Sequence, residues 1–283
     1  MVKMRDKMLE QKIQNAINNR SNVWVIGDIH GFYRTYSSLL EKLKLVNNDI
    51  VILLGDLIDR GPESSRVIEH VKSSSSIFSV RGNHESMMSN AIDPNNLISY
   101  SQDANSWYRN GGIATISSYL KDNKNPGRVL ARVKSDIAWI ETLPTEIVLE
   151  KYRLVHAGYD SRFGIEEQDE DIHLWVRDPF FKTKIPVDEN RQVIFGHTVT
   201  CKLPGFSNED LGRVWKSELK LSDGRSAMIG LDTCLFHYEE SAYLSAFNLL
   251  TKEVIQQERV EDWNKQIDMD LRMDSAVHSF YIE

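Results

Sequence analysis

Five short apolar runs in this chain end in turns that combine glycine with aspartate, asparagine or histidine. The turns read GDIHG at 27–31, GDLIDRG at 55–61, RGNHE at 81–85, HAG at 156–158 and GHT at 196–198. Glycine lets the backbone turn sharply after a strand, and the ends of strands in packed sheets meet at a common edge. If the runs form strands of packed sheets, the fold brings together at one rim the polar side chains of these turns: Asp28, His30, Asp56, Asp59, Asn83, His84, His156 and His197.

The first eighty residues alternate between strand and helix. Apolar runs without alternation predict buried strands at 23–26, 50–54 and 77–80. Apolar residues at helical spacing predict helices at 32–46 and 62–73. This order of strand and helix predicts an α/β fold whose sheet begins parallel, with a ligand site at the carboxyl ends of the strands.

The rest of the chain adds elements to the same fold. We expect one domain over 1–283, with a core at 22–250, a peripheral polar helix at 1–20 and a peripheral tail at 251–283. The other predicted elements are a helix at 104–120 interrupted at Gly111 and Gly112, a helix at 131–142, a hairpin at 146–155, strands within 192–198, 227–232 and 241–250, an acidic loop at 164–172 and a polar surface excursion at 205–226.

Composition narrows the class of protein. The 283 residues carry a formal net charge of -7 and a pI of about 5.7, so no basic field predicts binding to nucleic acid or to an anionic membrane. Cys201 and Cys234 are too few for a disulfide framework. The N-terminus has no apolar signal segment, and the longest apolar run is too short to span a bilayer. We expect a soluble cytoplasmic protein without membrane or nucleic-acid partners.

The side chains at the rim have the chemistry of a metal centre. Any one turn alone is also explained as a capped turn, with Asp28 as a helix N-cap, but five together favour function. Carboxylate, imidazole and amide ligands suit Mn, Fe or Zn, and Asp56 could bridge two ions about 3.5–4 Å apart. Two divalent ions, two carboxylates and a bridging hydroxide leave roughly one net positive charge, which attracts an anion and supplies a nucleophile near neutral pH. A phosphate ester fits such a site.

Together and in this order, the five turns resemble the signature of the PPP-type metallophosphatases, the serine/threonine protein phosphatase family within the calcineurin-like metallophosphoesterase superfamily. Other stretches look like the bacterial branch of that family: WYRNGGIATISSYL, YRLVHAGYD, EEQDEDIHLWVRDPFF and LDT at 231–233. The resemblance covers about 22–250. It implies a β-sandwich of two mixed sheets flanked by helices and two divalent metal ions, Mn or else Fe or Zn.

The resemblance also implies roles for the rim residues. The first ion would be bound by Asp28 and His30, and Asp56 would bridge the two ions. The ligands of the second ion would be completed by Asn83, His156 and His197. His84 would be the general acid that protonates the leaving alkoxide, with Asp59 orienting and charging it. Arg60 and Arg177 would bind the phosphate oxygens, together with Asn83.

Two alternatives remain open for the arginines. Arg177 could instead form a surface ion pair with Asp178, and Arg162 could take its place at the phosphate. Two guanidinium groups at one phosphoryl group favour a dianionic monoester, which presents three free oxygens, over a diester.

We therefore expect a phosphomonoesterase that hydrolyses phosphoserine, phosphothreonine and also phosphotyrosine in proteins, or small phosphomonoesters, by in-line attack of a hydroxide that bridges the ions. The alternative enzyme hydrolyses dinucleoside polyphosphates of the Ap4A type or nucleotides; such relatives tend to carry Asp where this chain has Glu85. A binding module without catalysis is a third alternative, which loss of the His84–Asp59 pair would favour, and the pair is present. If the acidic run at 166–171 borders the cleft, it would favour basic phosphopeptides.

Overall fold

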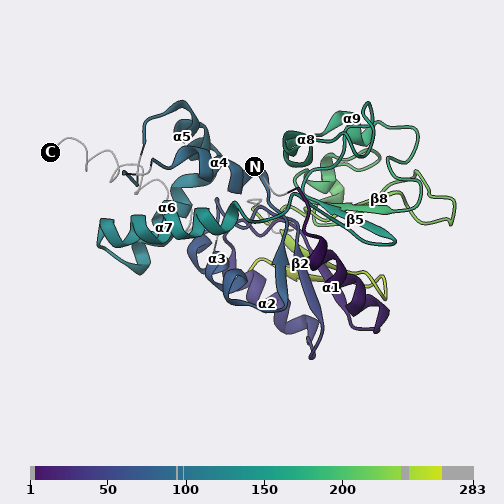
Figure 1. The fold of residues 1–283 in the computed structure, drawn as a ribbon, viewed down its shortest axis with the longest axis horizontal. Helices are drawn as coiled ribbons and strands as arrows, with labels where there is room; N and C mark the ends of the chain where they lie inside the picture. The colour runs from purple at the N-terminus through teal and green to yellow at the C-terminus, as the bar shows by residue number, and fades with distance from the viewer. Residues whose placement is uncertain (1–3, 94, 98, 237–241, 263–283) are drawn as a thin grey trace.

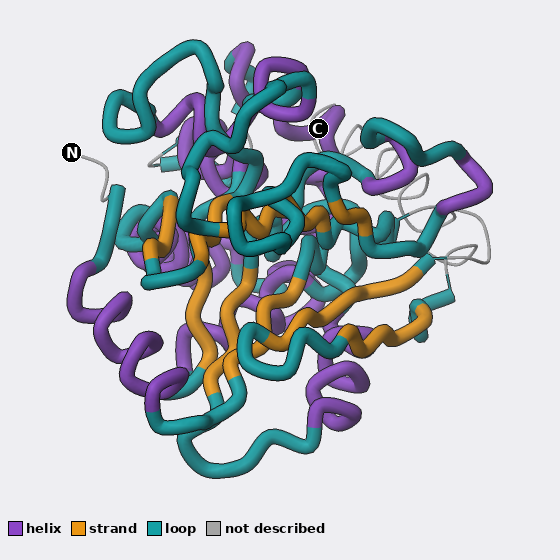
Figure 2. Tube along the Cα trace, turned by 90° about the vertical axis from the view of Figure 1, so that its right-hand side faces the viewer, coloured by secondary structure: helices purple, strands orange, loops and turns teal. Residues whose placement is uncertain are grey.

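Two five-stranded sheets, each with parallel and antiparallel pairs, form the centre of the molecule (Figure 1, Figure 2). The computed structural model describes residues 4–93, 95–97, 99–236 and 242–262. The first sheet has the order β10-β9-β1-β2-β3, with bounds Val254–Glu258, Tyr243–Asn248, Val23–Ile26, Ile50–Leu53 and Ile77–Ser79. The second has the order β4-β5-β6-β8-β7, with bounds Glu146–Val148, Tyr152–Val155, Gln192–Phe195, Met228–Gly230 and Trp215–Lys216.

A layer of apolar side chains fills the space between the two sheets. Val25 of β1 shares one fully buried cluster with Leu154 of β5 and Ile194 of β6. The opposite face of β1 is buried as well, because Trp24 and Ile26 belong to the cluster beneath the helices. Strands buried on both faces need no polar positions, which explains why β1 and β2 read as apolar runs without alternation.

Helices cover the outer side of the first sheet and one end of the molecule (Figure 1). The bounds are α2 Tyr33–Leu43, α3 Ser64–Ser73, α4 Asn83–Ala91, α5 Gln102–Trp107, α6 Ile113–Asp122, α7 Pro126–Ile140, α8 Glu170–Trp175 and α9 Asp178–Phe181. The predicted fold class, two mixed sheets flanked by helices, is confirmed. Within the described part of the chain, no helix combines the length and the apolar character that crossing a membrane requires.

The predicted interruption of the helix at 104–120 is present as a kink at Gly111, within the turn Tyr108–Gly112 that joins α5 to α6. Gly111 has φ 106°, and a Cβ atom there would lie 2.7 Å from the backbone nitrogen of Arg60. The carbonyl of Gly111 accepts the Arg60 N–H at 3.2 Å. Glycine is therefore needed here both for its conformation and for the close approach of the turn after β2.

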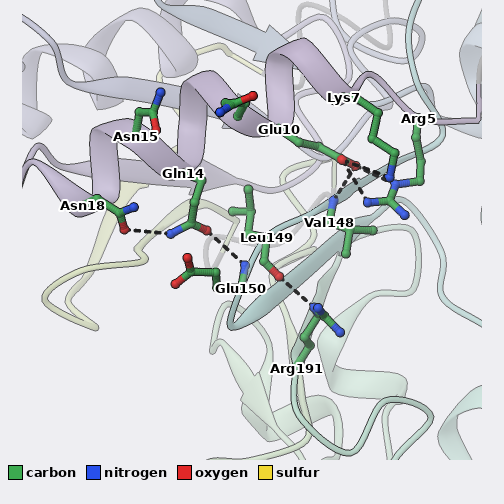
Figure 3. A pocket seen from close by; sticks show the side chains of 11 residues that line it. Arg5, Lys7, Glu10, Gln14, Asn15, Asn18, Val148, Leu149, Glu150 and Arg191 are labelled. Carbon is green, nitrogen blue, oxygen red and sulfur yellow. Dashed lines mark hydrogen bonds and ion pairs between the residues drawn. The ribbon is translucent and has the colours of Figure 1, made fainter.

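The N-terminal helix is part of the core, which corrects the expectation that 1–20 is peripheral. Helix α1, Lys7–Asn18, buries Ile13 fully in the cluster between the sheets. Polar contacts fix the helix to the hairpin of β4 and β5 (Figure 3). Glu10 accepts the N–H of Val148 at 2.9 Å, and Gln14 accepts the N–H of Glu150 at 3.0 Å. A mostly polar sequence concealed this role, because the apolar residues are few: Ile13 is fully buried, and Leu9, Ala16 and Ile17 pack partly buried against the same cluster.

The expected peripheral tail from 251 also needs correction, in the part that is described. Strand β10 pairs antiparallel with β9 and forms the edge of the first sheet. Beyond it, the buried Glu261 carboxylate accepts the N–H of Arg34 at 2.7 Å and of Thr35 at 3.2 Å, and also binds the Thr35 hydroxyl. These N–H groups belong to the first turn of α2, where the helix itself supplies no acceptor. Residues 263–283 lie outside the described part, so the single-domain organisation stays a prediction.

The predicted surface excursion at 205–226 is in part a strand and a packed loop. Strand β7 pairs with β8 at the edge of the second sheet. Trp215 is buried there, donates its indole N–H to the carbonyl of Pro204 at 2.9 Å, and shares a cluster with the buried Leu221. Two boundaries differ as well: α7 begins at Pro126 with Asn125 as its cap, and α8 begins within the expected acidic loop.

His173 of α8 generates a prediction about stability. The ring is buried against Tyr159, its Nδ1 lies 2.9 Å from the Thr145 hydroxyl, and burial lowers its pKa to about 4. The folded state then binds fewer protons than the unfolded state, so stability present above pH 6.5 is lost as the pH falls toward 4. We expect a loss of about 3 kcal/mol. Urea unfolding of the metal-free protein at pH 7 and 4.5 should show a smaller loss for His173→Asn, and an equal loss would contradict the prediction.

Candidate active site

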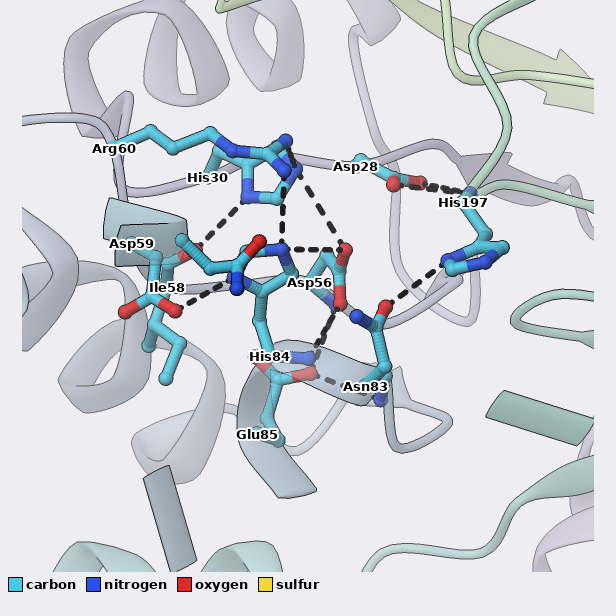
Figure 4. A network of polar contacts seen from close by, with 12 residues as sticks. Asp28, His30, Asp56, Ile58, Asp59, Arg60, Asn83, His84, Glu85 and His197 are labelled. Carbon is cyan, nitrogen blue, oxygen red and sulfur yellow. Dashed lines mark hydrogen bonds and ion pairs between the residues drawn. The ribbon is translucent and has the colours of Figure 1, made fainter. Parts of the chain in front are cut away.

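The five turns bring their polar side chains together, and Figure 4 shows those of four turns, all except the turn of His156, close to one another. In chain order, the turns after β1, β2, β3, β5 and β6 supply Asp28 and His30, Asp56 and Asp59, Asn83 and His84, His156, and His197. All eight side chains are buried. Asn83 and His84 begin helix α4 rather than forming an isolated turn. The structure thus gathers the eight predicted residues, while the role of each stays a prediction.

Several of these residues adopt a left-handed backbone, which non-glycine residues seldom do. The φ angle is 47° at His30, 48° at Asp56, 72° at Asp59, 68° at Arg60 and 61° at His197. Each such residue costs on the order of 1–3 kcal/mol. Their surroundings must therefore hold them; for example, the carbonyl of Asp56 accepts the His30 N–H at 2.8 Å. Concentration of strain at one rim is typical of a functional site.

Glu85 is fully buried and fixes the turn that carries Asp56. Its carboxylate accepts the N–H groups of Asp56 and Leu57 at 2.8 Å and of Gly82 at 2.9 Å. Burial raises the pKa of Glu85 to about 7, and backbone donors oppose that rise. From the sequence, Glu85 served only as an argument about the class of substrate. In the structure it joins the turn after β2 to the turn after β3.

The rings of His30 and His156 present lone pairs to the centre. Nδ1 of His30 lies 3.0 Å from the carbonyl oxygen of Ile58, and Nδ1 of His156 lies 2.7 Å from that of Leu54. A carbonyl only accepts, so we assign the ring proton to Nδ1 in both histidines. Burial lowers the pKa of both, which favours neutral rings. Each Nε2 atom is therefore an acceptor that points into the site.

The acceptor atoms are spaced as the ligands of a cation are. Nε2 of His156 lies 2.8 Å from Oδ1 of Asn83 and 3.4 Å from Oδ1 of Asp56, and Nδ1 of His197 lies 3.0 Å from the same Asn83 oxygen. Two ligand atoms about 2.1 Å from one ion and at right angles lie ~3 Å apart. Acceptors buried face to face repel unless a cation lies between them. The residues present therefore fit divalent cations.

Asp56 belongs to two groups of potential metal ligands. In each group the ligand atoms lie within 4.8 Å of one another: His30, Asp56 and His84 in the first, Asp56, His156 and His197 in the second. The Nε2 atom of His197 is also buried and has no hydrogen-bond partner among the described residues. The ring atom of His197 that faces the Asn83 oxygen is the other nitrogen, Nδ1, and the carboxylate common to both groups is what makes a site for two ions geometrically possible.

Asp28 lies at the margin of this centre. Its carboxylate accepts the backbone N–H of His197 at 3.0 and 3.1 Å, and it is outside both ligand groups. Burial, together with the nearby Asp232 and Asp56 carboxylates, raises the pKa of Asp28 well above its usual value. A divalent cation would reverse that rise, so the assignment of Asp28 as a metal ligand stays a prediction. Asp232, buried in LDT, was not singled out as a site residue in the sequence.

His84 differs from the other histidines because a carboxylate holds its second nitrogen. Nδ1 of His84 lies 2.6 Å from Oδ2 of Asp59. Burial lowers the pKa of His84, but Asp56 and Asp59 raise it more, so the net shift is upward. Its Nε2 faces the open centre at 3.8 Å from Asp56. The geometry therefore suits a ring that carries and releases a proton.

Two residues missed by the sequence analysis hold Asp59. The indole N–H of Trp107 lies 2.8 and 3.0 Å from the two Asp59 oxygens, and the Thr115 hydroxyl donates to Oδ1 at 2.6 Å. Thr115 and Ser64 also accept the backbone N–H of Asp59. Trp107 and Thr115 lie within the stretch that carried the family resemblance, but only the fold shows what they contact.

Arg60 lies over the histidines of the first group. Its guanidinium nitrogens lie 2.5 Å from Nε2 of His30 and 3.2 Å from Nε2 of His84. A metal ion bound to His30 would take the place of the nearer nitrogen. The other face of the guanidinium stacks on Phe236, with Cζ 3.8 Å from the ring centroid. Nothing in the sequence pointed to Phe236 as the support of this arginine.

Arg177 faces the same centre from the junction between α8 and α9. Its NH1 donates to the Thr198 hydroxyl at 2.5 Å, which places it beside the turn of His197. Burial lowers the pKa of Arg177, while the carboxylates of Asp232, Asp28 and Asp56 oppose this shift. An exposed guanidinium that faces carboxylates across the site is well placed for an anion.

The two alternatives for the arginines are not found in the structure. Asp178 forms its ion pair with Lys182 at 2.8 Å rather than with Arg177. Arg162 pairs with Asp160 at 2.5 Å, and its side chain is 70% exposed. Arg177 therefore keeps the predicted place near the centre, and Arg162 does not compete for it.

Histidine lone pairs around a buried carboxylate suit cations, and two guanidinium groups beside them suit an anion. At the strand ends of a two-sheet sandwich, this combination defines the class of metal-dependent phosphoester hydrolases. Residues 21–212 match the family described as calcineurin-like phosphoesterase. The chain belongs to this family of metallophosphoesterases, which use divalent metals.

Individual proteins similar to this chain include phosphatases and a tetraphosphatase. Serine/threonine-protein phosphatase 2 of Salmonella typhimurium is 34% identical over 198 residues, which are 66% of this chain and 84% of that protein. The symmetrical bis(5'-nucleosyl)-tetraphosphatase of Wigglesworthia glossinidia brevipalpis is 44% identical over 64 residues, 22% of this chain and 24% of that protein. The crystal structure of a metallophosphoesterase from Sphaerobacter thermophilus has a TM-score of 0.56 at 16% identity and covers 90% of this chain and 94% of its own. That structure supports the fold alone.

The support of Asp59 generates a prediction. Trp107→Phe removes the indole donor and leaves Asp59 free to turn away from His84, so we expect kcat/KM for an alkyl phosphomonoester to fall about 10-fold. Hydrolysis of 4-nitrophenyl phosphate, whose leaving group needs no proton, should change little. The matched control is Trp139→Phe, which alters the same hydrophobic core away from Asp59. An equal fall for both substrates would show that Trp107 acts only through folding.

Proposed function

We propose that this protein is a phosphoprotein phosphatase that hydrolyses phosphoserine and phosphothreonine, and also phosphotyrosine, in proteins. The observation that carries the proposal is the pairing of His84 with Asp59 beside acceptor atoms that fit cations. The match to a serine/threonine phosphatase over most of that protein supports the substrate class. The identity with the tetraphosphatase covers a quarter of that protein.

Six residues would hold two divalent ions, Mn or else Fe or Zn: Asp28, His30, Asp56, Asn83, His156 and His197. When bound, the ions would neutralise the phosphoryl oxygens and make water nucleophilic at neutral pH. Asp56 supports this arrangement because it is common to both ligand groups. The turns that carry the ligands are held by backbone hydrogen bonds and by Glu85, so the ligand atoms need little rearrangement.

The reaction requires a proton on the leaving alkoxide. His84 would supply it from Nε2, the ring nitrogen that Asp59 does not hold. Asp59 fixes the ring orientation and stabilises its charged form, and Trp107 and Thr115 keep the carboxylate in place. This is general acid catalysis by a positioned imidazole.

Arg60 and Arg177 would bind the phosphoryl oxygens that do not face the ions, with Asn83 beside them. Phe236 and Thr198 hold the two guanidinium groups in the absence of substrate. Two arginines add four or more donors at one phosphoryl group. Such a set suits a monoester dianion better than a diester, which has fewer free oxygens.

A second candidate function is hydrolysis of dinucleoside tetraphosphates. The short match to a symmetrical bis(5'-nucleosyl)-tetraphosphatase favours it. Glu85 stands where relatives with this function tend to carry Asp, but its carboxylate faces backbone N–H groups rather than the open side of the site. It therefore cannot discriminate substrates by contact, and only direct assay separates the two functions.

The direct test compares initial rates with Mn²⁺ on a set of phosphopeptides and on diadenosine tetraphosphate. We expect faster turnover of the peptides. Asp56→Asn serves as the blank, because losing the shared carboxylate should weaken metal binding and remove most activity. Faster turnover of the dinucleotide would overturn the proposed substrate class and favour the second candidate.

The role of His84 should be visible in how strongly the loss of activity on its replacement depends on the leaving group of the substrate. His84→Asn should lower kcat/KM for phosphoserine peptides by about 10²–10⁴-fold, since a positioned acid contributes that much. For 4-nitrophenyl phosphate the loss should be much smaller. Metal content measured on the same preparations controls for His84 as a ligand of the first group. Lost metal, or an equal loss on both substrates, would argue against the acid role.

A further inference from the structure

A groove of about 510 Å³ adjoins the active site. It lies along α8, the loop that precedes α8 and the start of α9, which sit beside each other near the second sheet (Figure 1). Arg177 lines this groove and also donates to Thr198 in the active centre. Trp175 lines it too, with its ring centroid 6.2 Å from that of His197. A peptide whose phosphate reached Arg177 would therefore lay neighbouring side chains along this groove.

The groove exposes aromatic surface that a folded protein normally buries. Trp175 is 44% exposed and Phe163 is 53% exposed. The remaining apolar lining comes from Ile172, Val176 and Pro179. The guanidinium of Arg162 already lies 5.9 Å from the Phe163 ring. Trp175 is thus the aromatic side chain left to receive a ligand.

Charge decides which ligand fits. The titratable lining consists of four acids and two bases: Asp160, Glu167, Asp169, Asp171, Arg162 and Arg177. Arg162 is paired with Asp160, and Arg177 faces the phosphate site. Among the described residues, no cation lies within ion-pair distance of Glu167, Asp169 or Asp171. The groove therefore offers, beside an exposed indole, three carboxylates without an ion-pair partner among the described residues, of which Glu167 and Asp169 accept the backbone N–H groups of Gly164 and Ile172.

We propose that this groove binds a basic side chain, preferably arginine, close in sequence to the phosphorylated residue of a protein substrate. A guanidinium stacks on an indole ring and pairs with carboxylates at the same time, so it complements both features of the groove. Acidic flanking residues would be repelled by Glu167 and Asp171. The inference rests on the proposed phosphatase function and deepens it, because it defines which phosphopeptides the site prefers.

The test uses two phosphopeptides that differ only in the residues flanking the phosphoserine, arginine in one and glutamate in the other. For the wild-type enzyme we expect a higher kcat/KM on the arginine peptide. Glu167→Gln/Asp171→Asn should reduce this preference by about 3- to 10-fold, as expected for two partly exposed ion pairs, mainly through KM. Hydrolysis of 4-nitrophenyl phosphate should stay unchanged. The preference should also shrink as salt screens the charges.

A matched control removes the same charge from remote exposed positions, Glu41→Gln/Glu150→Gln, and should keep the wild-type preference. Equal turnover of the two peptides by the wild-type enzyme, or the same reduction in the control, would overturn the groove assignment and leave the phosphatase function intact. Failure to hydrolyse any phosphopeptide, with 4-nitrophenyl phosphate still hydrolysed, would overturn the proposed function and this inference with it.

Discussion

The buried carboxylate of Asp56 is the group around which the other parts of the site are arranged. Its oxygens lie 3.4 Å from Nε2 of His156 and 3.6 Å from Nε2 of His30, and one accepts the N–H of His84 at 3.1 Å. Burial alone would raise the pKa of Asp56, and only positive charge facing the carboxylate, on a histidine ring or on a bound cation, holds it below its usual value. The anion is thus stable only because both sheets bring positive or cation-binding groups to it. Each turn that does so must hold its own geometry against strain.

That requirement explains where the strain and the unusual burial occur. The left-handed backbone of Asp56 is held by Glu85, whose carboxylate accepts the N–H of Asp56 and that of Leu57. Burying Glu85 is itself unfavourable, since desolvation opposes its charge. The sandwich core offsets these costs through apolar burial on both faces of β1 and β2. The local conformation of the site is therefore energetically unfavourable and is stable only as part of the whole fold.

Different parts of this arrangement were predictable from the sequence to different degrees. Convergence of the turns was predictable, because apolar runs mark strands and residues at strand ends meet at one edge. The support of Asp59 was not, because Trp107 and Thr115 lie about fifty residues away in sequence and nothing in their local pattern indicates contact. Strand β10 was missed for another reason: an edge strand with few apolar residues, VIQQE, has the composition of a solvated tail.

The chemistry and the selectivity of this protein depend on separate parts of the chain. Turns after strands of both sheets make the centre, and their geometry is held by contacts across the sandwich. The groove instead comes from the loop and short helices at 160–179, which contribute no strand to either sheet. Trp175 and Arg177 are the points where the two parts meet, through His197 and Thr198. Substitutions in the loop would therefore alter the proposed peptide preference while the arrangement around Asp56 remains intact.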